Sequence, residues 1–167
     1  MIAKIEYCKS PAKAIAYDAK LGQDKAHSVF LGSSFGETDP KEIIYRLNEV
    51  ANQNNKLNVN HKFLHISISF SPHEEIDRTQ MLSVSRIYLD KMYGTGLHYA
   101  CHFHDDKPHQ HMHLILSRVN ETGKILNSKY DWYRSKEICR ELELTFNLRP
   151  TKNEANEKRK IGSVGSC

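Results

Sequence analysis

The chain has 167 residues, of which 39% are hydrophobic and 26% charged, a balance that fits one globular domain with one core. No apolar run approaches the roughly 20 residues of a membrane span, and no apolar segment follows the first charges as in a secretory signal. We therefore expect no membrane association. The net charge of +4 permits a nucleic-acid partner, and four scattered cysteines indicate a reducing, cytoplasmic location.

Strands and helices alternate along most of the chain. Ser10 with Pro11, and Asp39 with Pro40, are typical of helix starts. The predicted elements, in chain order, are a strand at 1–7, a helix at 11–21, a short strand at 27–31, a helix that opens at Pro40, a strand at 62–70, a helix at 77–93, strands at 96–104 and 111–119, and a helix at 131–146. The remainder is polar, so we expect a domain at 1–148 and a flexible tail or truncation point at 149–167.

The strands at 96–104 and 111–119 are joined by only about six residues. A parallel pair needs a much longer crossover, so these strands must form an antiparallel hairpin. Helices packed on an antiparallel sheet define the predicted fold class, which is α+β.

Side chains alternate across a strand, and three predicted strands sort into one apolar face and one polar face. The apolar face carries Leu64, Ile66, Ile68, Phe70, Leu97, Tyr99, Cys101, Phe103, Met112, Leu114 and Leu116. The polar face carries His65, Ser67, Ser69, His98, His102, His104, His111 and His113. We expect helices to cover the apolar face and to leave the polar face free for a site.

The segment HFHDDKPHQHMH, residues 102–113, holds five of the ten histidines. If its connection is symmetric, His104 lies opposite His111 and His102 opposite His113, with Cβ atoms roughly 4.5–5.5 Å apart. Three imidazoles without a thiolate leave open coordination positions, as in catalytic metal sites, and ligand softness alone permits Zn, Ni, Fe or Mn. The competing interpretation is a set of histidines that bind no metal, but their shared face makes His104, His111 and His113 the predicted ligands.

Phosphoryl chemistry at a metal without a carboxylate cage needs a nucleophile from elsewhere in the chain. Tyr17 is one candidate, because helical spacing puts Lys13 and Lys20 on its side of the predicted helix. Two lysines beside a tyrosine suit contact with a phosphate backbone. A partly buried core tyrosine is the competing interpretation, and with eight tyrosines in the chain spacing alone does not select this one.

Four motifs together resemble those of plasmid and conjugative-element relaxases, which are HUH endonucleases, named for two histidines flanking a hydrophobic residue. His111-Met112-His113 is similar to that element, and His104-x-Asp106 to the His-x-Asp that precedes it. HISISFSP (65–72) resembles the serine-bearing strand motif, and AIAYDAK (14–20) the motif of the catalytic tyrosine. KILNSKYDWYRSKEICRELELTFNL is also similar to mobilisation proteins, so the resemblance covers roughly residues 1–148.

The resemblance implies an antiparallel sheet with a central HUH strand and metal-dependent nicking of single-stranded DNA at an origin of transfer. Tyr17 would form a 5′-phosphotyrosyl bond and release a 3′-hydroxyl, and the reverse step would religate the strand. The three ligand histidines would hold Mg²⁺ or Mn²⁺, with Zn²⁺ or Ni²⁺ as substitutes in vitro, and accessory mobilisation proteins are expected partners. Asp106 would orient a ligand histidine or help to deprotonate Tyr17. The expected nucleic-acid-binding residues are Lys13, Lys20, His65 and Ser67.

Several alternatives stay open at this point. Many family members carry Asn where this chain has Ser117, and a different alignment takes His102, His109 and His111 as the metal triad. His98 and His102 are candidates for a supporting role. Another HUH nuclease, of the replication-initiator or transposase kind, would share the metal and the tyrosine. A histidine-rich module that binds metal or DNA without catalysis is the non-enzymatic alternative.

Overall fold

The computed structural model describes residues 1–21, 28–56, 61–72, 74–104 and 107–151, with the side chains of 17–21 and 28 left out of that description. Its elements are β1 (Ile2–Cys8), α1 (Ala12–Leu21), β2 (Ser28–Ser33), α2 (Pro40–Asn52), β3 (Phe63–Ser69), α3 (Arg78–Tyr93), β4 (Tyr99–His104), β5 (His111–Ser117) and α4 (Asp131–Thr145). Within these ranges no helix has the length and apolar character needed to cross a membrane.

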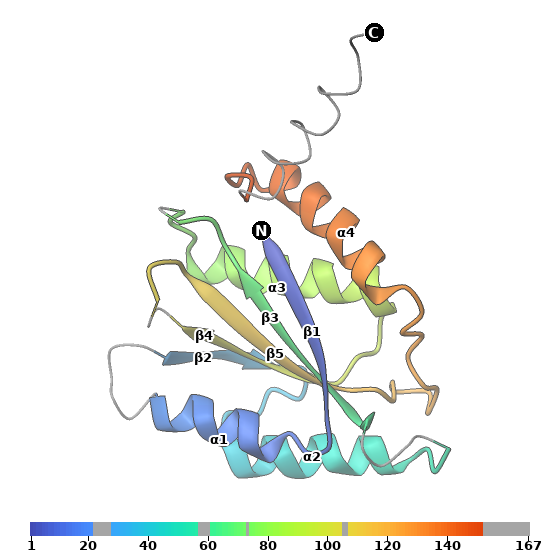
Figure 1. The fold of residues 1–167 in the computed structure, drawn as a ribbon. Coiled ribbons are helices and arrows are strands. Elements are labelled where there is room, and N and C mark those ends of the chain that lie inside the picture. Colours follow the sequence, from blue (N-terminus) through green and yellow to red (C-terminus); the bar gives the residue numbers. More distant parts are fainter. Residues whose placement is uncertain (22–27, 57–60, 73, 105–106, 152–167) are drawn as a thin grey trace, which may run out of the picture.

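The five strands form one antiparallel sheet in the order β1-β3-β5-β4-β2. The strand that carries His111-Met112-His113 is therefore central, as the resemblance implied. Helices α3 and α4 lie on one side of the sheet, and α1 and α2 lie on the other (Figure 1). The predicted α+β class is confirmed.

The apolar face of the sheet forms the main core with α3 and α4. Every second residue of β3 and β5 is fully buried there, among them Leu64, Ile66 and Met112. Methionines and aliphatic residues of α3 pack against them, together with Cys139 and Leu142 of α4. The predicted division of the strands into two faces is confirmed on this side.

The expectation that the polar face would be free of helices is wrong for half of that face. Phe63, Ala100 and Ile115 share the face with the histidines, and all three are fully buried beneath α1 and α2. Leaving Phe63 and Ile115 in water would cost about 1.5–3 kcal/mol each, which explains why helices cover this end. The histidine end of the same face remains available for a site.

The starts of α1 and α2 follow the predicted capping signals, and α3 begins at a capping box that was not predicted. The hydroxyl of Ser10 accepts a hydrogen bond from the Ala12 amide at 3.2 Å, and a carboxylate oxygen of Asp39 accepts one from the Lys41 amide at 3.0 Å. At α3, Asp77 and Gln80 satisfy each other's backbone N–H groups in a capping box. Local sequence therefore sets where these helices begin.

Candidate metal centre

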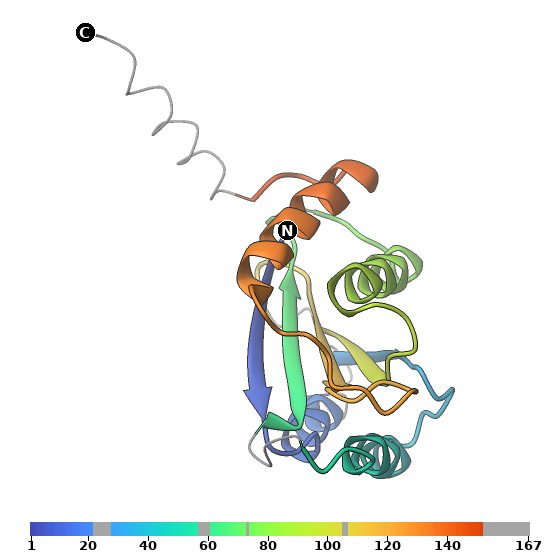
Figure 2. The same cartoon turned by 90° about the vertical axis from the view of Figure 1, so that its right-hand side faces the viewer.

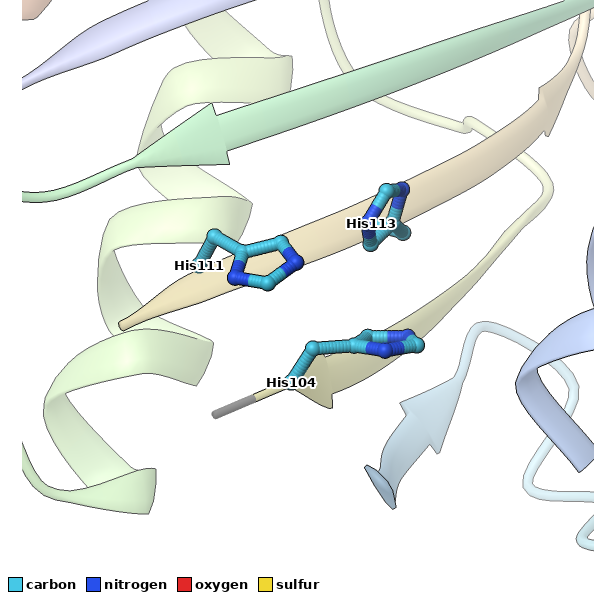
Figure 3. Close-up of side chains that lie close together, drawn as sticks. All are labelled: His104, His111 and His113. Carbon is cyan, nitrogen blue, oxygen red and sulfur yellow. The ribbon is translucent and has the colours of Figure 1, made fainter. Parts of the chain in front are cut away.

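The β4–β5 hairpin has the register that symmetric closure predicted. His104 lies opposite His111, and His102 lies opposite His113. The side chains of His104, His111 and His113 project from these two strands on the same side of the sheet (Figure 3). One ring nitrogen from each of them lies within 4.8 Å of the others, so this group of side chains can hold a metal ion.

The chemistry of this donor set fits a divalent ion. His104 and His111 are only 1% and 3% exposed, and His113 is half-buried, so the three rings are largely shielded from solvent. The ring centroids of His104 and His113 are 4.6 Å apart, and those of His111 and His113 are 5.2 Å apart. Three imidazole nitrogens leave further coordination positions for a substrate oxygen or water.

The alternative triad of His102, His109 and His111 does not form a comparable group among the described residues. The His102 ring packs edge-on against Phe30, with centroids 5.1 Å apart. His109 precedes β5, and its ring centroid lies 5.8 Å from that of His111. The geometry therefore favours His104, His111 and His113 as the ligand set.

His65 contacts the ligand set directly, a relation that the sequence did not reveal. Its Nε2 lies 2.6 Å from Nδ1 of His113, and the two rings are stacked with centroids 4.9 Å apart. If an ion takes Nε2 of His113, Nδ1 keeps its proton and donates a hydrogen bond to Nε2 of His65. The predicted contact of His65 with DNA stays a prediction. The contact that the structure shows is with His113, one of the three candidate ligands.

Replacing His65 with alanine should weaken divalent-metal binding about 10–100-fold, because His113 loses the partner that fixes its ring and its tautomer. His65→Gln should recover part of the affinity, since the glutamine side chain has an oxygen that accepts a hydrogen bond. Isothermal titration with Mn²⁺ measures both effects, and His98→Ala serves as the matched histidine control. Parental affinity in His65→Ala would show that this contact has no influence on the ion.

Gln110, the residue before His111, ties the hairpin to the start of α3. Its backbone oxygen accepts a hydrogen bond from the Phe70 amide at 3.0 Å, and its side-chain oxygen accepts one from the Ile76 amide at 2.9 Å. These two bonds hold the strand that carries His111 against the segment between β3 and α3.

Gln110→Ala should lower the free energy of unfolding by about 1–2 kcal/mol, because the half-buried Ile76 amide loses its acceptor. Gln110→Glu keeps an acceptor oxygen and should be nearly as stable as the parent. Urea unfolding in the presence of a chelator measures the difference. Equal stabilities of the two variants would contradict a structural role for the side-chain bond.

Several predicted site residues lie wholly or partly outside the described residues. Asp106 is one of them, as are the side chains of Tyr17 and Lys20. The backbone of α1 is described, and its buried Ile15 packs with Ala100 and Ile115 on the face that carries the histidines. Lys13 is exposed on the same helix. The helix proposed to carry the nucleophile thus lies on the histidine side of the sheet.

Ser67, Ser117 and His98 have distinct surroundings. Ser67 is directly opposite His113, so its half-buried side chain lies beside the ligand set. Ser117 is buried, and its hydroxyl accepts a hydrogen bond from the Val119 amide at 3.0 Å, which is a structural contact. His98 stacks on Phe35, and partial burial lowers its pKa against the opposing effect of Glu121.

Comparison with known proteins agrees with this geometry. The family described as "Relaxase: MobA/VirD2-like, nuclease domain" matches residues 7–148, a span that includes α1 and all three clustered histidines. No curated protein sequence matches the chain. A structure reported as "Molecular Basis of Vancomycin Resistance Transfer in Staphylococcus aureus" contains a chain with 13% identity and a TM-score of 0.53, and the similarity covers 90% of this chain and 95% of that one. That identity shows a shared fold alone, whereas the family match extends over most of the sequence, and the chain therefore belongs to the MobA/VirD2-like relaxases through their nuclease domain.

Proposed function

We propose that the protein nicks one DNA strand at an origin of transfer and rejoins it by transesterification, which starts conjugative mobilisation. The observation that carries this proposal is the cluster of His104, His111 and His113, whose ring nitrogens lie within 4.8 Å of one another in a relaxase-family chain. A phosphodiester bound there has its negative charge directly beside the ligand set. The helix with the candidate nucleophile packs on the same face of the sheet.

The proposed reaction exchanges one phosphodiester for another. The oxygen of Tyr17 attacks the scissile phosphorus, and the bond from phosphorus to the 3′-oxygen breaks. The phenolic proton passes to a base, for which Asp106 is the candidate, and the 3′-oxygen takes up a proton as it leaves. The products are a 5′-phosphotyrosyl protein and a free 3′-hydroxyl, and the reverse attack religates the strand.

The surrounding side chains orient the substrate and the ligand set. A divalent ion, Mg²⁺ or Mn²⁺, would supply stabilisation of the charge that develops on the phosphate. His65 holds the ring of His113 in place. Ser67 lies directly opposite His113 on the neighbouring strand. Lys13 and Lys20 would contact the phosphates that flank the scissile bond.

The deciding experiment incubates the protein with labelled single-stranded oligonucleotides that carry candidate origin sequences and with Mn²⁺. We expect a covalent adduct that survives denaturing electrophoresis and does not form when a chelator is present from the start of the reaction. A matching duplex and a scrambled strand serve as controls. Metal binding without any adduct on a panel of origin sequences would favour the non-catalytic module instead. Adducts formed only with replication or transposon-end sequences would favour another class of HUH nuclease.

A further inference from the structure

A stripe of aromatic and basic side chains on α4 lies outside the metal centre. Trp132 is 65% exposed, and the neighbouring Tyr133 and Tyr130 are 64% and 76% exposed. The Trp132 and Tyr133 rings meet edge to face, with centroids 4.9 Å apart. Large aromatic side chains usually bury most of their surface, so three exposed rings within four residues indicate a binding surface.

Two cations continue the stripe along the helix. Lys136 and Arg140 follow Trp132 at intervals of four residues, which places all three on one side of α4. The ammonium group of Lys136 lies 5.8 Å from the centre of the Trp132 ring. Glu137 lies on the neighbouring side of the helix, in line with Tyr133.

The stripe borders a cavity of about 350 Å³ between α4 and the first residues of β1. Trp132, Lys136 and Arg140 line one wall, and Ile2 and Ala3 line the other. Pockets of this size accept small planar ligands. An aromatic ring, an apolar wall and two cations are the chemistry that a nucleobase with its phosphate requires.

The metal centre and this cavity lie on opposite faces of the sheet, and the edge strand β1 lies between them. His113, Ser67 and Lys4 lie in one row across β5, β3 and β1, and two strand spacings put Lys4 about 10 Å from His113. Lys4 is exposed and β1 is an edge strand. α4 runs beside β1 at that edge of the sheet (Figure 2). A DNA strand that crosses Ser67 and Lys4 would have to pass around the edge formed by β1 to reach the cavity on the other face.

We propose that Trp132, Lys136 and Arg140, with the adjoining cavity, form a second binding site for single-stranded DNA. The site stacks bases of the same strand whose phosphodiester lies at the metal centre, and this identification of the strand rests on the proposed function. A duplex hides the faces of its bases, so exposed rings favour a single strand. A helical protein partner would call for an aliphatic groove, whereas this stripe alternates a ring with cations at helical spacing.

Fluorescence reads this site directly, because Trp132 is the single tryptophan of the chain. Titration with oligo(dT) in the presence of a chelator should quench the emission as bases stack on the ring. Inorganic polyphosphate, which has charge but no bases, should leave the emission nearly unchanged. Binding of oligo(dT) measured by anisotropy without any change in tryptophan emission would overturn the proposal.

Two sets of variants extend the test. Lys136→Ala with Arg140→Ala should weaken oligo(dT) binding at least about tenfold and lower the salt dependence by about two phosphate contacts. Lys124→Ala, which removes an exposed lysine from a turn, is the matched control. Trp132→Phe should bind nearly as tightly as the parent and Trp132→Ala should not, because phenylalanine can still stack. Unchanged affinity in both alanine variants would overturn the proposal.

The adduct assay separates this proposal from the proposed function. At saturating concentrations of an origin oligonucleotide, the α4 variants should still form the covalent adduct, because the metal centre is intact. Quenching without any adduct would support the α4 site and contradict the transesterase. An adduct without quenching, and with unchanged affinity in the α4 variants, would leave the transesterase standing and remove the α4 site.

Discussion

Tyr17→Phe should abolish the covalent protein–DNA adduct while leaving the fold, metal binding and most of the DNA affinity intact. The substitution removes one hydroxyl group, and without that oxygen no ester to phosphorus can form. A free phenol has a pKa of about 10 and is a weak nucleophile at neutral pH. A nearby divalent cation and the lysines of α1 would favour the phenolate, which is why the position of this tyrosine matters.

Mass spectrometry of the trapped peptide measures this prediction. Tyr45→Phe is the matched control, since Tyr45 is exposed on the neighbouring helix α2 and should be dispensable. Circular dichroism and Mn²⁺ titration check that the Tyr17 variant keeps its fold and its ion. A fully active Tyr17→Phe protein with the adduct on another tyrosine would refute this assignment and leave the metal centre unaffected.

Replacing both His111 and His113 with alanine should abolish tight binding of divalent metal and, with it, the adduct. Two of the three clustered ring nitrogens are lost, so the decrease in affinity should exceed the roughly 100-fold effect of losing a supporting contact. Isothermal titration with Mn²⁺ measures the affinity, and a thermal unfolding curve shows whether the double variant remains folded.

Single variants test the choice of triad. His109→Ala should keep near-parental affinity, because His109 lies outside the clustered group, and His61→Ala is a control for an exposed histidine. His104→Ala should resemble the loss of a ligand. The opposite pattern, in which His109→Ala loses the ion and His104→Ala keeps it, would support the alternative set of His102, His109 and His111.

The sequence by itself determined the hairpin and the face on which its histidines lie. A connection of about six residues permits only antiparallel pairing, and symmetric closure then sets His104 opposite His111. Strand alternation separates these histidines from Met112 and Leu114 whatever the rest of the chain does. The starts of α2 and α3 were equally local, because Asp39 and Asp77 cap the residues that follow them.

Only the tertiary structure decided which partner supports the ligand set. His65 and His113 are 48 residues apart, and their contact depends on how β3 pairs with β5. A shift of one residue in that register would turn His65 to the other face of the sheet. Strand alternation excludes such a one-residue shift, but it does not choose among shifts of two residues, because no hairpin turn joins β3 to β5.

The cover over the histidine face and the surface on α4 also depended on long-range packing. Phe63 and Ile115 lie on the face that the sequence predicted to be free, and their cover follows from how α1 and α2 fold back over the sheet. The sequence around Trp132 does not reveal a binding surface, because the cavity beside this residue exists only when β1 forms the edge of the sheet. Periodicity along the chain assigns a residue to a face, whereas the neighbour on that face is chosen by the free energy of burying apolar surface over the whole domain.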